Sequence, residues 1–394
     1  MTYPTVRIQP GRDKRFRAGS PWLYSNELVM DAAAKALEPG SIVRPMSENG
    51  KVMGVAHFNP HTLIAARMLT RNKDATIDAA FFRHRFERAL KLRERFYDRR
   101  CYRLVHAEGD GLPGLVVDRY NNVLVAQFNT AGMQSQAGLI CEVLEGLIAP
   151  AAILARNDAP IRELEGLPLE QAIMSGTAGA VTRIKENGLP FEVPLADGQK
   201  TGWYFDQREN RAFIRRMAHG ADVLDLYSYS GGFGLNALDG GAASALLVDR
   251  SEQALTMARA SAALQGSGER LETSQNDVFH EAAALIEAKR RFDIVIADPP
   301  PFVRSKKDLA TGLKGYRKLA RMSATLVREP GFLAVGCCSH NVSMTAFAEE
   351  IRSGVKAAGR GGRQIFASGA SPDHPIHPGL PETAYLKFIV LALD

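Results

Sequence analysis

The second half of the chain contains four apolar runs of strand length, and each is followed by residues that can take part in chemistry. They lie in DVLDLYSYSGGFG (222–234), SALLVDR (244–250), FDIVIADPPPF (292–302) and GFLAVGCCSHN (331–341). Apolar strands that alternate with helical stretches are typical of a mainly parallel sheet covered on both faces. Ligands bind such sheets at the carboxyl ends of the strands. The sequence therefore predicts an α/β domain with its site at these strand ends.

The first two strand ends indicate a nucleoside cofactor. Gly231 and Gly232 allow a tight turn and a close approach of the backbone to a ligand. Asp249, at the end of the next strand, is placed to accept hydrogen bonds from both ribose hydroxyls. Asp277 follows a third strand and is placed beside the base. Turn formation and helix capping are the alternative explanation for these residues.

The strand 292–297 ends in Asp298, followed by three prolines and Phe302. Consecutive prolines neither continue a strand ladder nor start a helix freely, so they hold Asp298 in a rigid corner. A nicotinamide dehydrogenase has no use for this corner. A methyltransferase that holds a flat base against a sulfonium does.

Length and charge extend this interpretation to the whole chain. A chain of 394 residues is expected to form two or three domains. Its net charge of +6 favours a polyanionic partner, with nucleic acid as the first candidate. The N-terminus lacks the apolar core of a signal peptide, and no stretch approaches the roughly 20 apolar residues that span a bilayer. A cytoplasmic protein without membrane contact is expected.

Residues 1–72 read as a small β domain, because short β-like runs alternate with turns there. Arg12 and Lys14 precede Trp22, which combines phosphate-pairing cations with a stacking aromatic ring. A solvated loop beside a core tryptophan is an equally good explanation. Residues 73–190 read as a middle α+β domain, with helical patterns near 74–100 and 133–147 and a hairpin turn at Asn121-Asn122. The α/β domain then occupies residues 191–394.

The four cysteines are Cys101, Cys141, Cys337 and Cys338. They form no CxxC pair and have no histidine at zinc spacing, so neither a metal site nor a disulfide framework is expected. Side chains of neighbouring strand residues point to opposite faces. At a regular strand end, at most one of Cys337 and Cys338 therefore faces a base, and local sequence does not say which.

With these residues in view, the chain resembles the bacterial large-subunit ribosomal RNA cytosine-5 methyltransferases, which use S-adenosylmethionine. The resemblance spans nearly the whole chain and rests on stretches that include GSPWLYSNE, EGDGLPGLVVDRY, GQKTGWYFDQREN, YSYSGGFG, ADPPPF, GCCSHNVS and DHPIHPGLPETAYLK. It implies a PUA domain, a middle domain of strands flanking a helix, and a class I Rossmann-fold methyltransferase domain. RNA is the implied partner, and a homodimer is left open.

The resemblance also implies roles for individual residues. The cofactor site would consist of Gln207, Ser228, Gly231, Gly232, Asp249, Asp277 and Asp298. Arg208 would lie near the RNA substrate, and Trp22 would contact RNA. The family pattern usually has lysine where this chain has Pro301, so a contact made by that lysine would be missing here.

For catalysis, the resemblance implies that Cys338 is the nucleophile, since it directly precedes serine. A thiolate that adds to C6 of cytosine makes C5 reactive, and a base must later remove the C5 proton. Asp298 would contact the ring N3 and the amino group. Glu382 is the candidate base, by analogy with uracil-5 methyltransferases. The alternatives are a uracil-5 methyltransferase, an amino-group methyltransferase and a non-catalytic RNA-binding assembly factor.

Overall fold

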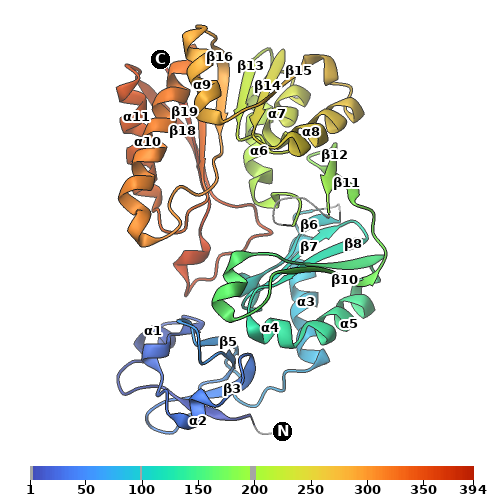
Figure 1. Cartoon of the computed structure of the whole chain (residues 1–394), viewed down its shortest axis with the longest axis vertical. Helices are drawn as coiled ribbons and strands as arrows, with labels where there is room; N and C mark the ends of the chain where they lie inside the picture. The colour runs from blue at the N-terminus through green and yellow to red at the C-terminus, as the bar shows by residue number, and fades with distance from the viewer. Residues whose placement is uncertain (1–2, 98–99, 196–200) are drawn as a thin grey trace. The chain divides into compact units, whose positions relative to one another are not determined.

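The computed structural model describes residues 3–97, 100–195 and 201–394, which fall into two compact units (Figure 1). Unit 1 consists of residues 1–180, 199–203 and 372–383, and unit 2 consists of residues 181–198, 204–371 and 384–394. A segment close to the C-terminus thus belongs to the unit that the N-terminal half forms. The expected domain boundaries after residues 72 and 190 remain sequence-based predictions.

Unit 1 begins with a five-stranded sheet of order β1-β3-β4-β5-β2. Its strands are β1 (Thr5–Arg7), β2 (Trp22–Leu23), β3 (Ser41–Met46), β4 (Val55–Phe58) and β5 (Ala66–Thr70). The short helices between them are α1 (Lys14–Arg17), η1 (Ser25–Glu27) and α2 (Ala32–Lys35). The core of this part contains Phe16, Leu23 and Phe58. The expected β-rich N-terminal part is therefore present.

A second five-stranded sheet of order β10-β9-β8-β7-β6 completes the strands of unit 1. Its strands are β6 (Cys101–His106), β7 (Leu115–Tyr120), β8 (Val123–Phe128), β9 (Ala152–Asn157) and β10 (Glu170–Gly176). Its helices are α3 (Ala79–Arg93), η2 (Ala107–Asp110), α4 (Ala131–Ser135), α5 (Ala137–Ile148) and η3 (Pro160–Glu165). The hairpin prediction is confirmed, because β7 pairs with β8 around Asn121, whose φ is 57°.

The helical predictions for this part are correct in place but not in extent. Helix α3 begins only after Asp78, whose side chain accepts a hydrogen bond from the amide of Phe81 at 2.9 Å. An N-cap of this kind satisfies an amide that has no partner within the helix. The second helical stretch is interrupted at Gln136, so α4 and α5 are separate helices.

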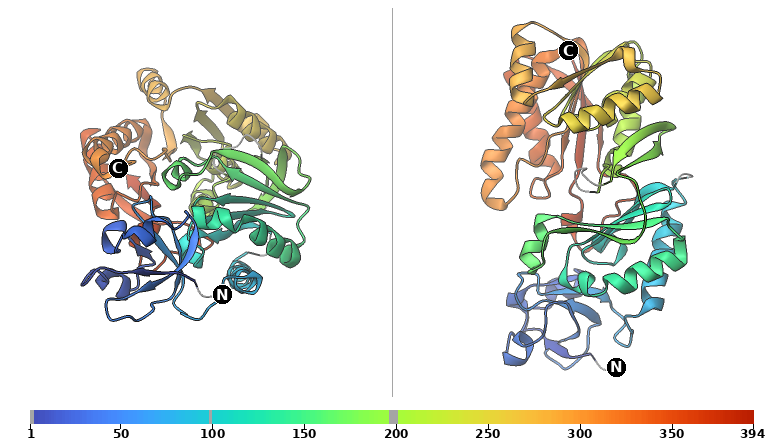
Figure 2. Two further views of the ribbon diagram at one scale, coloured as in Figure 1. Left: turned by 60° about the horizontal axis from the view of Figure 1, so that its bottom comes forward. Right: turned by 45° about the vertical axis from the view of Figure 1, so that its right-hand side comes forward.

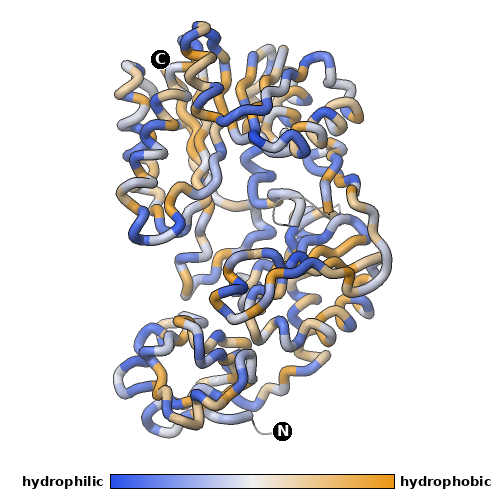
Figure 3. Tube along the Cα trace, in the orientation of Figure 1, coloured by the Kyte–Doolittle hydropathy of each residue, from blue (hydrophilic) through white to orange (hydrophobic). Residues whose placement is uncertain are grey.

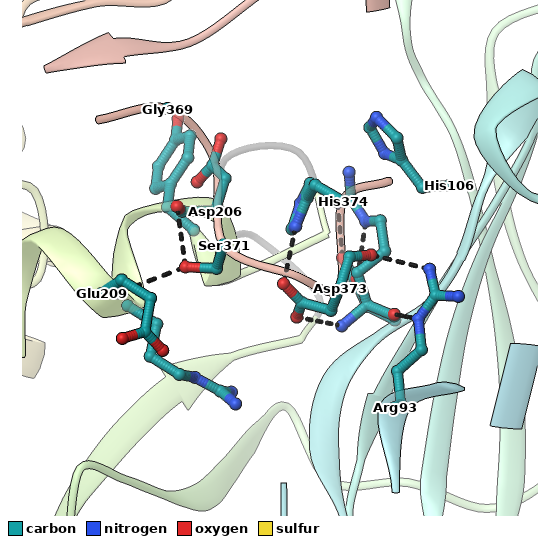
Figure 4. A network of polar contacts seen from close by, with 12 residues as sticks. Arg93, His106, Asp206, Glu209, Gly369, Ser371, Asp373 and His374 are labelled. Carbon is teal, nitrogen blue, oxygen red and sulfur yellow. Dashed lines mark hydrogen bonds and ion pairs between the residues drawn. The ribbon is translucent and has the colours of Figure 1, made fainter. Parts of the chain in front are cut away.

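A buried arginine ties the 372–383 segment to the rest of unit 1. Arg93 is fully buried and donates to both carboxylate oxygens of Asp110, at 2.6 and 2.7 Å. The same guanidinium donates to the carbonyl oxygen of Asp373 at 2.7 Å, and the amide of Arg103 donates to the Asp373 carboxylate at 3.0 Å (Figure 4). The Asp373 carboxylate also bonds to Nδ1 of His374 at 2.8 Å.

Unit 2 contains the hairpin of β11 (Val181–Glu186) and β12 (Leu189–Pro194) and a seven-stranded sheet of order β15-β14-β13-β16-β17-β19-β18. The strands of this sheet are β13 (Asp222–Leu226), β14 (Ser244–Asp249), β15 (Leu271–Gln275), β16 (Phe292–Ala297), β17 (Val327–Cys337), β18 (Gly362–Ser368) and β19 (Lys387–Leu393). Strands β13 to β17 are parallel, while β19 is antiparallel to β17 and β18. The predicted mainly parallel sheet is confirmed.

Helices cover both faces of this sheet (Figure 2). They are α6 (Arg208–Met217), α7 (Gly232–Asp239), α8 (Glu252–Leu264), α9 (Val278–Glu287), α10 (Leu309–Leu326) and α11 (Met344–Ala357), with the short helices η4 (Phe205–Gln207), η5 (Gly268–Arg270) and η6 (Lys306–Asp308). Leu246 and Val248 belong to the core shared with α9, α10 and α11. Leu247, between them, points toward the glycine loop and α8 on the opposite face.

Apolar residues concentrate along the strands of this sheet (Figure 3). Among the described helices, none is long and apolar enough to cross a membrane.

The buried contact between Arg93 and Asp110 yields a stability prediction. Asp110→Ala leaves the Arg93 guanidinium buried without its carboxylate, and such a loss costs about 3–5 kcal/mol. We expect the free energy of unfolding of unit 1 to fall by this amount in urea denaturation. Both tryptophans of the chain, Trp22 and Trp203, belong to unit 1, so their fluorescence reports on it.

The matched control removes an exposed ion pair. Arg7 and Asp31 meet at 3.1 Å on the surface of unit 1, where solvent screens the charges. Arg7→Gln should change the stability of unit 1 far less than Asp110→Ala. Equal effects of the two substitutions would contradict a stabilising role for the buried pair.

Candidate active site

Five consecutive strands bring the predicted site residues of unit 2 to one edge of the sheet. Strands β15, β14, β13, β16 and β17 are neighbours in this order and run parallel. Their carboxyl ends therefore lie side by side. The predicted residues at or just after these strand ends are, in the same order, Asp277, Asp249, Ser228, Asp298 and Cys338.

The loop after β13 has a strained backbone. Tyr227 and Tyr229 have φ values of 62° and 49°, in the left-handed region, which costs a non-glycine residue roughly 1–2 kcal/mol. Gly231 also has a positive φ of 79°, and a Cβ there would lie 2.8 Å from a methyl carbon of Leu247. Strain of this kind is concentrated at functional sites. The glycine is required both for its φ and for the close packing of the loop on β14.

Three buried polar atoms around this loop have no hydrogen-bond partner within the described ranges. They are the hydroxyl oxygens of Ser228 and Ser230 and Oδ1 of Asp225. The other carboxylate oxygen of Asp225 accepts a hydrogen bond from the amide of Gly234 at 2.9 Å. Burial, assisted by the negative charges of Asp298 and Asp249, raises the pKa of Asp225 to about 7. Buried polar groups without partners are costly, so they mark a place where a polar ligand can bind.

The carboxylates of Asp249 and Asp277 both accept hydrogen bonds from backbone amides. The two carboxylate oxygens of Asp249 accept from the amides of Tyr229 and Ser251, at 2.8 and 2.9 Å. Each oxygen has a second lone pair, which a ribose hydroxyl can use. Asp277 caps α9 through the amides of Phe279 and His280 and forms an ion pair with Arg250. Helix capping by Asp277 is therefore present, and its contact with a base stays a prediction.

The proline corner after β16 places Asp298 against β17. A Cβ on Gly336 would lie 2.1 Å from Oδ1 of Asp298, so the carboxylate occupies the space that the glycine leaves. Gln207 donates from Nε2 to Oδ2 of Asp298 at 2.8 Å, and Asn210 donates to Oε1 of Gln207 at 2.6 Å. This chain of hydrogen bonds orients the carboxylate. The structure thus brings together Gln207 and Asp298, two of the predicted site residues.

The two adjacent cysteines have different environments. Cys337 is the last residue of β17 and is completely buried, and burial raises the pKa of its thiol. Cys338 is the one cysteine of the four that is not buried. Its sulfur lies 3.8 Å from the carbonyl oxygen of Pro299, in the corner that carries Asp298. The less buried thiol therefore contacts the corner that carries Asp298.

The residues predicted to contact RNA lie in different settings. Arg12 and Lys14 are exposed near the first sheet of unit 1. Trp22 is half-buried and donates from its indole nitrogen to Glu108 at 2.8 Å. Arg208 is buried and forms an ion pair with Glu186 at 3.3 Å. RNA contact by these residues stays a prediction. The ion pair with Glu186 gives Arg208 a structural role.

Two other predicted features lie on the surface. Glu382 is exposed in the short helix η7 (Pro381–Thr383), which belongs to unit 1, whereas Cys338 belongs to unit 2. Its role as a base stays a prediction. Pro301 is exposed in the corner after Asp298.

In the described ranges, no group of three or more His, Cys, Asp or Glu side chains is arranged to hold a metal ion.

Sequence reasoning missed three residues of this site. Asp225 lies within an apolar strand, Asn210 supports Gln207 from the first turn of α6, and Lys387 is a buried charge at the start of β19. A charged residue beside a strongly apolar run, as in AYLKFIVLALD, was the available signal for Lys387. Nothing local distinguishes Asn210 from any other polar helical residue.

Two family models match the chain. A PUA-like domain matches residues 6–71, and S-adenosylmethionine-dependent methyltransferase matches residues 148–353. The second match includes Gln207, the glycine loop and Cys338. The strand-end residues described above thus fall within a region of known methyltransferase character.

Named relatives match over nearly the full length. Ribosomal RNA large subunit methyltransferase I of Alteromonas mediterranea is 35% identical, with 98% of each chain covered. The protein of the same name from Shewanella amazonensis is also 35% identical, again with 98% of each covered. A methyltransferase structure solved in complex with SAH has the same fold, with a TM-score of 0.84 at 21% identity and full coverage of both chains. The chain therefore belongs to the S-adenosylmethionine-dependent methyltransferase family whose members include the proteins named ribosomal RNA large subunit methyltransferase I.

Proposed function

We propose that this protein methylates C5 of a cytosine in large-subunit ribosomal RNA through a transient bond between Cys338 and C6 of the base. The observation that carries the proposal is the position of the Cys338 thiol. It is accessible and lies 3.8 Å from the carbonyl of Pro299, in the corner that holds Asp298. The names of the relatives support ribosomal RNA as the substrate class.

The chemistry requires a thiolate, a partner for the base and a proton acceptor. Addition of the Cys338 thiolate to C6 raises the electron density at C5 so that it can accept a methyl group. Removal of the C5 proton then lets the C6–sulfur bond break, which restores the aromatic ring and the free thiolate. Asp298 would bind the ring N3 and the amino group, and Glu382 would accept the proton. The target base has to be unpaired or flipped out of its stack to reach Cys338.

The environment of Phe302 supports this chemistry over transfer to an amino group. Amino-group methyltransferases stack the target base on an aromatic ring directly after the prolines. Here Pro301 separates that ring from the usual position, and Phe302 packs against Tyr316 with ring centroids 4.8 Å apart. A ring engaged in the core is a poor platform for a base, whereas Cys338 is accessible.

The residues around the glycine loop fit S-adenosylmethionine. When bound, the cofactor supplies a methyl group on a positively charged sulfur. The hydroxyls of Ser228 and Ser230 and Oδ1 of Asp225 would bind its polar methionine end, since they lack partners in the described ranges. Asp249 would bind the ribose through its remaining lone pairs. Gly231 and Gly232 would let the backbone approach the ligand closely.

Asp225 makes both stability and cofactor binding depend on pH. Its pKa in the folded protein is about 7, above the value of 3.8 for a free side chain. The folded state therefore binds this proton more tightly than the unfolded state does, and stability falls as pH rises from about 4 to about 7. The charged form of Asp225 attracts the positively charged cofactor. The same charge that lowers the stability of the fold therefore favours cofactor binding.

Asp225→Asn tests this assignment. At pH 8 the substitution removes a buried charge, so we expect a thermal unfolding midpoint a few degrees higher, with weaker binding of S-adenosylmethionine. At pH 5 both side chains are neutral in the folded protein, so the difference between the two midpoints should be clearly smaller than at pH 8. Calorimetry of both proteins at both pH values checks the sign. A midpoint difference that is the same at pH 5 and pH 8 would contradict the assignment.

Cys338→Ala tests the covalent step. Ribosomal RNA that carries 5-fluorocytidine lacks the removable C5 proton, so the enzyme should remain covalently bound to it, visible as a shifted band in a denaturing gel. Cys338→Ala should abolish both this complex and methyl transfer. Cys337→Ala, one residue away and buried, is the matched control and should still trap RNA. The reverse pattern would make Cys337 the nucleophile and overturn the proposal.

Glu382→Gln tests the proton acceptor. With ordinary ribosomal RNA, this variant should form the thiol adduct but release product slowly, because the C5 proton cannot leave. A covalent complex should then accumulate that the unmodified enzyme does not show. Turnover equal to that of the unmodified enzyme would exclude Glu382 as the base without affecting the assignment of Cys338.

A further inference from the structure

A buried lysine lies beside the two cysteines. Lys387 begins β19 and is only 5% exposed. Its ammonium group donates to the carbonyl oxygens of Ser339 and Tyr385, at 2.7 and 2.9 Å. Within the described part of the chain, it forms no ion pair with a carboxylate. A buried charge normally requires an opposite charge nearby.

Two of the groups near Lys387 that can become anionic are thiols. In the register of the sheet, Lys387 is the partner of Cys337 on β17. Burial lowers the pKa of Lys387, whereas Cys337 and, to a smaller extent, Cys338 raise it. The carbonyl oxygens of Ser339 and Tyr385 accept hydrogen bonds from Lys387, but they do not neutralise its positive charge.

Tyr316, Tyr204 and Asp298 are titratable groups near these thiols that supply no cation, and His340, which follows Ser339, is exposed. Tyr316, from α10, hydrogen-bonds to the hydroxyl of Ser339 at 3.3 Å. Burial raises the pKa of Tyr316 and of Tyr204, which precedes η4, so both stay neutral. Asp298, after β16, opposes thiolate formation at Cys337. Lys387 acts in the opposite direction and favours the thiolate of Cys337.

Only one of the two thiols can use this charge for reaction with a substrate. Cys337 is completely buried, while Cys338 is partly exposed beside the Pro299 carbonyl. The carbonyl that Lys387 holds belongs to Ser339, the residue that directly follows Cys338. The lysine therefore also restrains the backbone on which the Cys338 side chain stands.

We propose that Lys387 is the positioning residue of Cys338: its ammonium group holds the Ser339 carbonyl and stabilises the thiolate of Cys338. This inference rests on the proposed role of Cys338 as the nucleophile. Opposite charge within about 4–6 Å shifts the pKa of a group by roughly 1–3 units toward the charged form. A larger fraction of thiolate near neutral pH makes the cysteine more reactive.

The pH dependence of alkylation tests the inference without RNA. The full-length protein is treated with iodoacetamide at a series of pH values, and the modification of Cys338 is followed by peptide mass spectrometry. In the unmodified protein, the midpoint should lie below about 8.5, the ordinary value for cysteine. Lys387→Met should raise it by about one unit or more, and Lys387→Arg, which keeps the charge, should restore most of the reactivity.

Two controls keep the result interpretable. Lys318→Met removes an exposed lysine of the same unit, whose ammonium lies 4.5 Å from the ring of Phe279, and should leave the midpoint unchanged. Binding of S-adenosylmethionine verifies that each variant is folded. If Lys387→Met does not fold, the unmodified protein decides, because a midpoint at or above about 8.5 would refute the inference. Equal midpoints for the unmodified protein and Lys387→Met would refute it too.

Failure of the inference and failure of the proposed function give different results. An unchanged alkylation profile in Lys387→Met, with methyl transfer lost in Cys338→Ala, removes only the role of Lys387. A shifted profile, with methyl transfer retained in Cys338→Ala, removes only the role of Cys338 as nucleophile. In the supported case, Lys387→Met also lowers kcat at neutral pH, and higher pH recovers part of the loss.

Discussion

The site depends on one close approach, that of the Asp298 carboxylate to the backbone of Gly336. Strand β16 pairs with β17 up to Ala297 and Val335, and Asp298 and Gly336 are the residues that follow this pair. Any side chain at 336 would clash with the carboxylate, since a Cβ would lie 2.1 Å from Oδ1. The missing side chain lets the proline corner lie on β17. As a result, Pro299 comes within 3.8 Å of the Cys338 sulfur.

Several unfavourable features are collected around this edge of the sheet. Tyr227 and Tyr229 adopt left-handed backbone conformations, Asp225 is a buried acid with an unpartnered oxygen, and Lys387 is a buried cation. None of them stabilises the fold by itself. The apolar core between the sheet and α9, α10 and α11 offsets their cost. Such a distribution is expected of a site that needs polar groups in fixed positions before its ligands arrive.

Much of the fold could be predicted from local patterns. Strands, helices and turns depend mainly on residues that are close together in the sequence. Apolar runs separated by helices predicted the parallel sheet, and Asn121-Asn122 predicted the β7–β8 hairpin. The extent of the helices was less predictable, since α3 begins only at its Asp78 cap. The return of residues 372–383 to unit 1 was not predictable, because it depends on the contact of Arg93 with Asp373, 280 positions apart in sequence.

By itself, the sequence determined which chemical groups follow each strand, and strand alternation determined that at most one of Cys337 and Cys338 faces a base. Only the tertiary structure decided that Cys338 is the accessible thiol, that Gln207 orients Asp298, and that Arg208 pairs with Glu186. It also placed Lys387 opposite Cys337. The physical reason is that these relations arise across strands and helices distant in sequence, where pairing register and burial, rather than local pattern, determine the neighbours of each side chain.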